Sequence, residues 1–387
     1  RYQGVTGVQT CALPILMNLD KPLLPGQVIG IIGGGHLAKM MALSAREMGF
    51  RVGVLDPQID CPAAQVADWQ LLGAYNDPEA LEKLAKRAQV ITYEFEHADV
   101  DALTAIQHLA NIPQGTDILA ITQDRLMEKS FLEDNNIVIA PYATIVSPTD
   151  IQEAIDGIGY PCILKNTRGE GRYVLHSTSD LAPSMNLLRE GTCVLEAWIP
   201  YEKELSVLIS GNGRGEFATF PVVETIKKER KLHETIAPAR IDDEVSGELQ
   251  RIAKVIAKAV GLVGTLSIEM FYTETGGIYV NKILPRPEDA GNFSIDACSF
   301  SQYDTHIRGL CNWSMPTIQL LSEAVTVNVL GNEAYETMDI INEHPDWHFH
   351  YYGHSEAKAQ RAMGHITILT KEIDETLEEI KETKIWS

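Results

Sequence analysis

The stretch QVIGIIGGGHLAKMMALSAREMGFRVGVLDP, residues 27–57, has the pattern of a strand, a glycine turn, a helix and a second strand. The apolar run at 28–32 is typical of a strand that is buried on both faces of a parallel sheet. The apolar residues that follow recur with the spacing of one helix face: Leu37, Met40, Met41 and Ala45. A unit of this kind predicts an α/β domain.

The glycine turn allows two interpretations. Gly33, Gly35 and Ala38 fit the pattern G-x-G-x-x-G/A, and Asp56 ends the second strand. The turn could hold a nucleotide phosphate at a helix N-terminus, as in a nicotinamide oxidoreductase. It could equally be a tight turn that needs small residues for close packing, and the motif alone is weak. An oxidoreductase would also leave the central 200 residues unexplained.

Helices and strands keep alternating over the next hundred residues. The patterns predict a helix at 78–87, a strand at 89–95 and a helix at 100–109. Farther along, a helix and a strand follow Asp124, and the apolar runs then predict mainly β structure. The expected elements are a glycine-turn hairpin at 159–177, two β runs within 191–210, a strand at 217–226, an amphipathic helix at 243–264, a hairpin of 265–273 with 277–284, and a β-rich tail beyond Pro316.

Composition restricts the class of protein. The chain has 387 residues, 45% of them hydrophobic and 22% charged, as in an ordinary globular protein. Its formal net charge of −21 argues against a nucleic-acid partner or an anionic membrane surface. The six cysteines form no C-x-x-C pair, which favours a reducing cytoplasm. No apolar run approaches the roughly 20 residues that a membrane-spanning helix needs.

The first sixteen residues, RYQGVTGVQTCALPIL, differ in character from the rest. They contain no acidic residue and no initiating Met, and Met17 then opens an ordinary domain sequence. A signal peptide would need a more basic start and a longer apolar core. We interpret residues 1–16 as a non-native leader and leave them out of the fold.

Charged and polar residues gather at predicted strand ends in the middle of the chain. Lys165 precedes a glycine turn and suits a triphosphate, and Glu204 follows a polar connector and suits ribose hydroxyls. Glu269 lies on a strand whose predicted partner carries Asn281 and Lys282, and carboxylates on such strands suit Mg²⁺ together with phosphates. Each residue alone is more often structural, so only their order along the chain favours a site.

Longer stretches carry a resemblance to a known family. They include ITYEFEHAD (91–99), QDRLMEKSFLEDNNI (123–137), EAWIPYEKELSV (196–207), GTLSIEMF (264–271), SIDACSFSQYDTHIRGLC (294–311) and YYGHSEAKAQRAMGHITI (351–368). Residues 27–370 thereby resemble the ATP-grasp ligases, and within them the N5-carboxyaminoimidazole ribonucleotide synthetase family. The resemblance implies a mixed α/β and α+β fold of three domains. These are a Rossmann-like N-terminal α/β pre-ATP-grasp domain (17–115), an ATP-grasp domain (116–312) with two subdomains split near 190, and a β-rich C-terminal domain (313–387).

The resemblance also implies roles for individual residues. The ATP-binding set is Arg125, Lys165, Gly169, Gly171, Glu196, Ala197, Trp198, Ile199, Glu204, Lys227 and Asn281. The substrate-binding set is Gly35, His36, Leu37, Tyr93, Glu94, Glu96, His354 and Arg361. Glu269 would hold the metal, and the catalytic set is Lys282, Arg286, Glu288 and Asp289.

The family's chemistry implies ATP and Mg²⁺ as cofactors, and bicarbonate and 5-aminoimidazole ribonucleotide as substrates. ATP phosphorylates bicarbonate to carboxyphosphate, whose carboxyl group the amine of the ribonucleotide then captures. The product, N5-carboxyaminoimidazole ribonucleotide, belongs to purine biosynthesis, and the family implies a homodimer.

Several working positions depart from the family pattern. The glycine loop after Lys165 is about four residues shorter and lacks Tyr-Asp. Lys227 stands where a His is expected, and Lys282 replaces a second metal-binding Glu. Glu288 and Asp289 replace the His-Asn that follows the Pro-Arg-Pro sequence, and His354 and His36 replace a lysine and a glutamine. We expect Lys282 to repel Mg²⁺ and to be able to pair with Glu269. Two hypotheses follow: a re-wired active enzyme, or a silenced homologue that keeps fold and binding.

Overall fold

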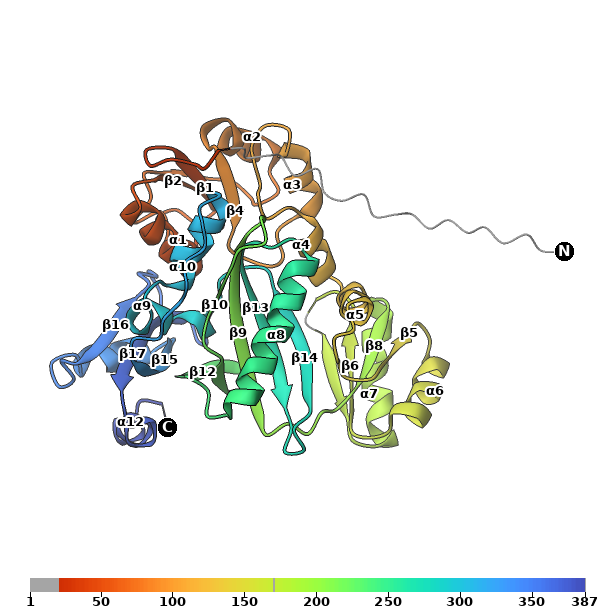
Figure 1. Cartoon of the computed structure of the whole chain (residues 1–387). Coiled ribbons are helices and arrows are strands. Elements are labelled where there is room, and N and C mark those ends of the chain that lie inside the picture. Colours follow the sequence, from red (N-terminus) through yellow and green to blue (C-terminus); the bar gives the residue numbers. More distant parts are fainter. Residues whose placement is uncertain (1–20, 170, 387) are drawn as a thin grey trace.

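The computed structural model describes residues 21–169 and 171–386 (Figure 1). The interpretation of residues 1–16 as a leader lies outside this part of the chain. The described residues form three sheets: a parallel sheet near the N-terminus, a small antiparallel sheet and a large antiparallel one. The predicted mixture of α/β and α+β structure is confirmed.

The N-terminal sheet has the order β3-β2-β1-β4, and all its pairs are parallel. Its strands are β1 (Val28–Ile32), β2 (Arg51–Leu55), β3 (Trp69–Leu71) and β4 (Val90–Tyr93). The helices are α1 (His36–Glu47), α2 (Pro78–Arg87) and α3 (Val100–Ile106). The predicted bounds of the first strand and of α2 are confirmed. Asp77 caps α2 by accepting a hydrogen bond from the Glu79 amide, and Pro78 suits its first turn.

The small antiparallel sheet has the order β5-β8-β6-β7. Its strands are β5 (Tyr142–Ile145), β6 (Cys162–Asn166), β7 (Arg172–Leu175) and β8 (Cys193–Ala197). The helices α6 (Pro148–Ile158) and α7 (Leu181–Glu190), the latter preceded by η1 (Thr178–Asp180), pack on this sheet. The preceding helices pack elsewhere: α4 (Asp117–Thr122) in the core of the N-terminal domain and α5 (Arg125–Asp134) in that of the large sheet. The pairing of β6 with β7 confirms the predicted glycine-turn hairpin.

The large sheet has nine strands in the order β14-β13-β9-β11-β12-β15-β17-β16, with β10 paired to β9. From the centre of the chain come β9 (Lys203–Asn212), β10 (Phe217–Thr219), β11 (Val223–Lys228), β12 (Lys231–Ala237), β13 (Val263–Tyr272) and β14 (Ile278–Leu284). From the C-terminal part come β15 (Glu323–Leu330), β16 (Trp347–Tyr351) and β17 (Ala362–Thr370). The C-terminal strands thus extend the central sheet.

Helices cover this sheet and connect it to the rest of the molecule. The helix α8 (Asp243–Ala259) packs on β9 and β13, as Figure 1 shows. Tyr303, Ile307 and Leu310 of α10 (Gln302–Leu310) share one apolar core with α1 and thereby join the N-terminal sheet to the large sheet. The remaining helical segments are η2 (Asp289–Gly291), α9 (Ser294–Ala297), α11 (Glu333–Asp339) and α12 (Ile373–Glu382).

Several expected elements differ from the structure. The strand expected at 89–95 is the shorter β4, and the helix expected at 100–109 ends at Ile106. The strand expected at 217–226 is broken into β10 and β11, because Pro221 lies between them and has no amide to donate to a ladder. The helix expected at 243–264 ends at Ala259. Gly261 then adopts a φ of +59°, which turns the chain so that the apolar residues after it enter β13.

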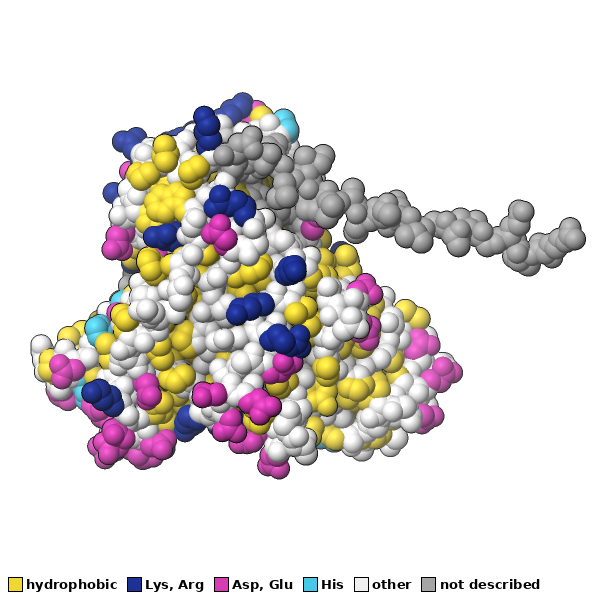
Figure 2. All heavy atoms as spheres, in the orientation of Figure 1, with side chains coloured by type: hydrophobic (Ala, Val, Ile, Leu, Met, Phe, Trp, Pro, Cys, Tyr) yellow, Lys and Arg dark blue, Asp and Glu magenta, His cyan; other side chains and the backbone are white. Residues whose placement is uncertain are grey.

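The surface is consistent with the acidic composition. Figure 2 shows acidic side chains crowded at the lower edge of the molecule, where α12 lies with Asp374, Glu375, Glu378, Glu379 and Glu382. Within residues 21–169 and 171–386, none of the helices is both long enough and apolar enough to cross a bilayer.

Candidate active site

The turn between β1 and α1 is held by two carboxylates of the protein. Glu94, just after β4, accepts hydrogen bonds from the amides of Gly35 (2.9 Å) and Ala38 (2.8 Å). Asp56, just after β2, accepts one from the Gly34 amide at 2.8 Å. A carboxylate at a helix N-terminus is stabilised by the dipole of the helix. These amides are therefore used inside the protein, so the dinucleotide interpretation of the glycine pattern loses its main support.

His36 joins this turn to two distant segments of the chain. Its Nε2 lies 2.8 Å from Oδ1 of Asp289, and its ring stacks on Tyr352 with 4.5 Å between centroids. The side chains of His36 and Asp289 are 21% and 19% exposed, so the pair is largely screened from water. Burial opposes protonation of His36, but the Asp289 carboxylate outweighs it and raises the pKa of His36. His36 is therefore a cation over a wider pH range than an isolated histidine.

The predicted substrate residues His354 and Arg361 lie near the same place. The Lys39 ammonium donates to the Tyr352 carbonyl at 2.8 Å. Burial, followed by the charges of Arg361, His36 and Lys39, lowers the pKa of His354 to about 4. The structure thus brings α1 and the segment between β16 and β17 together, so that the cations His36, Lys39 and Arg361 lie around a neutral His354.

Two residues of the predicted substrate set do not present their side chains to this place. Leu37 packs in the core between α1 and α10, and Tyr93 is 0% exposed in the core of the N-terminal domain. The sequence could not reveal that these two side chains are buried in a core, because Leu37 follows His36 and Tyr93 precedes Glu94, and both neighbours are polar. The Tyr93 hydroxyl is buried and has no hydrogen-bond partner among the described residues.

Arg286 is the centre of a second charged cluster. Its guanidinium donates to Oε2 of Glu96 at 2.8 Å and to Oε2 of Glu288 at 2.5 Å, and its side chain is only 12% exposed. The ammonium of Lys282 lies 3.3 Å from Oε1 of Glu96. Burial disfavours the Glu96 carboxylate, but Arg286 and then Lys282 outweigh burial and lower the pKa of Glu96 to about 2. Residues from the predicted catalytic and substrate sets therefore form a single network.

The expected pairing of Lys282 with Glu269 is wrong. The two residues do oppose each other in the β13–β14 ladder, but the ladder is irregular immediately after Glu269. Lys282 turns to Glu96, and the cation beside Glu269 is Lys227, at 3.3 Å. Lys227 also lies 2.9 Å from Glu204, so the predicted ribose and metal ligands share one lysine.

The carboxylates near Glu269 fit a magnesium ion that is shared with a nucleotide. Asn281 Nδ2 donates to Glu269 Oε2 at 3.4 Å, which places the two predicted neighbours together. Burial raises the pKa of Glu288, opposed by Arg286, and the charges of Asp289 and Glu269 raise it further. Mg²⁺ is commonly held by one or two carboxylates together with substrate phosphates. Glu269 is a carboxylate of the kind that could serve, although its Oε2 also lies 3.3 Å from the Lys227 ammonium.

The predicted triphosphate contacts lie between the small sheet and α5. Lys165 of β6 is 2.8 Å from Oε2 of Glu196 on β8, and Lys129 is 3.5 Å from Oε1. Burial opposes ionisation of Glu196, but these two lysines outweigh burial and lower the pKa of Glu196. Arg125 begins α5, and its buried Nε has no hydrogen-bond partner within the described residues. An arginine with an unused donor is suited to an anionic ligand.

The glycine loop and the connector adjoin this group. The β6–β7 turn is closed by a hydrogen bond from the Asn166 amide to the Gly171 carbonyl, and Gly169 adopts a φ of +89°. A Cβ on Gly171 would approach the side-chain ends of Asn166 and Leu187 to 2.9 Å, so a larger residue here would require these side chains to move. The predicted hinge continues from β8 through Ala197, Trp198 and Ile199, and the Trp198 side chain is exposed.

Sequence reasoning missed several residues of the site. Lys129 lies one helical turn after Arg125, so the i, i+4 spacing on α5 could have indicated it. Glu128 accepts a hydrogen bond from the Ile283 amide at 2.7 Å, and burial raises its pKa to about 7. Tyr352 and Asn292 are joined by a 3.2 Å hydrogen bond. Nothing in the sequence signals these last two contacts, because the partners come from distant segments.

Comparisons with known proteins agree with this arrangement. Models of three domain families match the chain: the ribonucleotide synthetase preATP-grasp domain at residues 27–123, the ATP-grasp domain at 130–303, and the phosphoribosylaminoimidazole carboxylase C-terminal domain at 324–379. The N5-carboxyaminoimidazole ribonucleotide synthase of Bacillus subtilis is 39% identical over 372 residues, which cover 94% of this chain and 96% of the relative. The chain belongs to the N5-carboxyaminoimidazole ribonucleotide synthase family.

Solved structures of the N5-carboxyaminoimidazole ribonucleotide synthase family have the same fold. An ADP complex of an N5-carboxyaminoimidazole ribonucleotide synthetase matches with a TM-score of 0.91 and 42% identity, covering 94% of this chain and 98% of the other. The Aspergillus clavatus synthase, in complex with ADP and 5-aminoimidazole ribonucleotide, matches with a TM-score of 0.88 and 26% identity, covering 94% and 99%. The predicted family, its ATP-grasp ligase class and the predicted three-part fold are confirmed.

Proposed function

We propose that this chain carries out the ATP-dependent carboxylation of 5-aminoimidazole ribonucleotide by bicarbonate, giving N5-carboxyaminoimidazole ribonucleotide. The observation that carries the proposal is the relationship to the Bacillus subtilis synthase across 94% of the chain. The other candidate, a silenced homologue, was suggested by the two acids Glu288 and Asp289 and by Lys282.

The arrangement of charges supports activity in spite of these departures. Glu288 is paired with Arg286, Asp289 with His36, and Lys282 with Glu96. Three cationic groups thus face three carboxylates in one network. Because each acid has its own cation, the predicted bicarbonate pocket does not carry a large excess of negative charge.

The proposed reaction has two steps. An oxygen of bicarbonate attacks the γ-phosphorus of ATP, the bond to the β-phosphate oxygen breaks, and ADP leaves. The amine of the ribonucleotide then attacks the carboxyl carbon of carboxyphosphate, loses a proton and releases inorganic phosphate. Negative charge develops on phosphoryl and carboxyl oxygens in both steps. Arg286, the least exposed cation of its network, is the residue we assign to stabilise that charge.

We assign the other residues to binding and positioning. Arg125 and Lys165 would contact the ATP phosphates, with Gly169 and Gly171 in the loop beside them. Residues 196–199 would contact the adenine, and Glu204, held in place by Lys227, the ribose. His36, Lys39 and Arg361 are cations that suit the phosphate of the ribonucleotide, and the neutral His354 lies among them as a further hydrogen-bonding group.

Glu269 and Glu288 would hold Mg²⁺ together with the ATP phosphates. When bound, the ion would neutralise charge on the phosphoryl oxygens. We also propose a cytoplasmic homodimer, on the basis of the cysteine pattern and the family resemblance. We keep the domain limits at 115 and 312, with the ATP-grasp domain divided near 190.

The test is phosphate release measured with ATP, Mg²⁺, bicarbonate and 5-aminoimidazole ribonucleotide, each omitted in turn. We expect turnover on the order of 10 per second, which is typical of enzymes, and only in the complete mixture. Arg286→Lys should lower kcat. Arg251→Lys is the matched control, because Arg251 is an exposed arginine whose partner Glu248 lies on the same helix. Release that ignores the ribonucleotide would contradict the proposal, and ADP binding without any turnover would establish the silenced homologue.

A further inference from the structure

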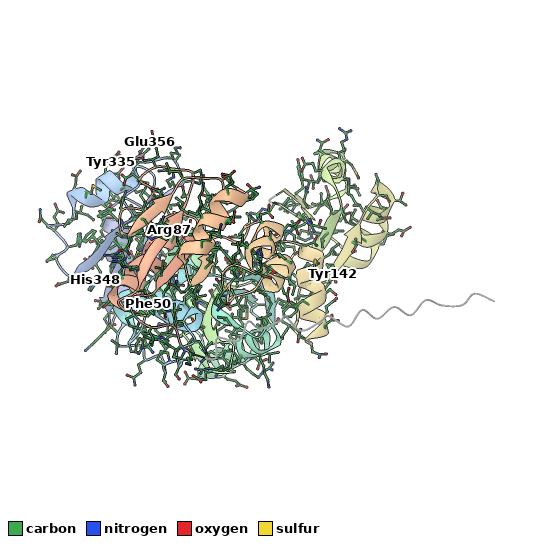
Figure 3. The ribbon with its side chains drawn as sticks, turned by 90° about the horizontal axis from the view of Figure 1, so that it is seen from above. Phe50, Arg87, Tyr142, Tyr335, His348 and Glu356 are labelled. Carbon is green, nitrogen blue, oxygen red and sulfur yellow. The ribbon has the colours of Figure 1, made fainter. Side chains whose placement is uncertain are left out.

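Three possible metal ligands meet behind Tyr352, the residue on which His36 of the proposed active site stacks. They are Asp296 of α9, His350 of β16 and His365 of β17, and one ligand atom from each lies within 4.8 Å of the others. His350 and His365 are direct cross-strand partners, with ring centroids 4.5 Å apart. In Figure 3, His348 of the same strand β16 is labelled at the opposite end of the molecule from Tyr142. The proposed function uses none of these residues.

His365 has a nitrogen that is not used inside the protein. The residue is 0% exposed, and its Nδ1 lies 2.8 Å from the Tyr352 hydroxyl. Its Nε2 is buried and lacks a hydrogen-bond partner within residues 21–169 and 171–386. In the tautomer whose Nδ1–H donates to the Tyr352 hydroxyl, Nε2 carries a lone pair, and this is the form in which histidine binds a metal.

The other groups complete a donor set around that nitrogen. Nε2 of His350 lies 2.9 Å from Oδ2 of Asp296, and Nδ1 of His348 lies 3.3 Å from Oδ1 of the same carboxylate. Residues 348 and 350 alternate by two along a strand, so both point to one side of the sheet. The cluster therefore contains the imidazoles of His350 and His365 and the carboxylate of Asp296. The His348 imidazole lies near the same carboxylate.

We propose that Asp296, His350 and His365 bind one divalent transition-metal ion, with His348 or water as the fourth ligand. Zn²⁺ fits best, because it is bound tetrahedrally by imidazole and carboxylate ligands, whereas Mg²⁺ prefers oxygen. The Tyr352 hydroxyl would orient His365, as an outer partner commonly does for a metal-binding histidine.

A metal ion at this place would fasten α9 to the hairpin of β16 and β17. Tyr352 connects the proposed site to the rest of the molecule, because its hydroxyl also accepts a hydrogen bond from Asn292, whose Nδ2 lies 3.2 Å from Asp289. We therefore assign the ion a structural role that stabilises the C-terminal part of the large sheet. This role does not depend on the proposed reaction.

The test uses the full chain after chelator treatment, in excess Mg²⁺ so that oxygen-ligand sites are filled. Co²⁺ is titrated in and followed by its visible absorption, and Zn²⁺ is then measured by competition. We expect one equivalent to bind, and His350→Gln to weaken binding by roughly a hundredfold or more. His344→Gln is the matched control, because His344 lies close to β16 but pairs with the exposed Glu379 instead.

A second measurement guards against a variant that fails to fold. Zn²⁺ should raise the melting temperature of the wild-type chain and of His344→Gln, and should leave that of His350→Gln unchanged. His350 is partly exposed, so its replacement leaves the core packing intact, and circular dichroism of the variant checks this. Zn²⁺ binding that survives His350→Gln would place the ion elsewhere and overturn the proposal. So would a wild-type chain that binds no Co²⁺ at hundred-micromolar concentrations.

Discussion

Glu96→Gln removes one charge from the centre of the Arg286 cluster without changing the shape of the side chain. Glu96 receives two hydrogen-bonded cations, Arg286 at 2.8 Å and Lys282 at 3.3 Å, and its side chain is only 18% exposed. The variant leaves Arg286 with an ion pair to Glu288 and a hydrogen bond to the Pro287 carbonyl. We expect a clear loss of stability whose size depends on pH.

The magnitude follows from the pKa of Glu96. Burial opposes ionisation, and the two cations lower the pKa from 4.5 to about 2. One pKa unit corresponds to 1.36 kcal/mol, so the charged form of Glu96 stabilises the folded state by about 3 kcal/mol at pH 7. The folded-state pKa is depressed, so this stabilisation is present above pH 4.5 and is lost as the pH falls toward 2. At pH 3.5 about 2 kcal/mol should remain.

The assay is equilibrium unfolding in urea, followed by far-UV circular dichroism at pH 7 and at pH 3.5. Glu248→Gln is the matched control, because it breaks the ion pair between Glu248 and Arg251, which are 2.7 Å apart. Their side chains are 43% and 60% exposed. Exposed pairs contribute about 0–1 kcal/mol, so the control should change little at either pH. A loss in Glu96→Gln no larger than in the control, or one that is the same at both pH values, would refute the reasoning.

Two further variants test other parts of the site. His36→Gln should lower the free energy of unfolding by about 2 kcal/mol at pH 6, because it removes a hydrogen bond between charged groups. The pKa of His36 is raised, so this stabilisation is present below pH 6.5 and is lost as the pH rises through the raised pKa. Urea unfolding at pH 6 and pH 9 measures it, and a larger loss at pH 9 would contradict the assignment. Arg125→Ala should weaken ADP binding roughly tenfold or more in calorimetry, with little change in stability, because its Nε has no partner among the described residues. Unchanged ADP affinity, judged against Arg251→Ala, would remove Arg125 from the nucleotide site.

The sequence predicted the fold well where apolar spacing and turn residues agree. The bounds of β1 and α2 are reproduced, because a continuous apolar run and a capped, Pro-initiated helix leave few alternatives. The prediction of helix and strand bounds fails where the apolar spacing of a helix continues past the residue at which the helix ends. The apolar residues after Ala259 keep the helical spacing, but Gly261 turns the chain and starts β13.

The residues of the site could be predicted from the sequence, but which cation pairs with which carboxylate could not. The resemblance supplied Glu96, Lys282 and Glu269, and the structure brings them into adjoining networks. The choice of partner depends on the irregular ladder after Glu269, which sends the lysine at 282 to a carboxylate 186 residues earlier in the chain. The charge pattern of the sequence could not reveal this. Glu269 lies opposite Lys282 in the β13–β14 ladder, whereas Glu96 comes close to Lys282 only through the tertiary fold.

The shared sheet has a consequence for how the protein is made. The strand β12 pairs on its outer side with β15, which is synthesised about ninety residues later. Until β15 leaves the ribosome, β12 presents an unpaired edge, which is a place where other chains can add. A product that stops before Glu323 would therefore be expected to aggregate rather than to yield a soluble ATP-grasp core. Slow translation or early termination in that interval should expose the chain to chaperones and proteases.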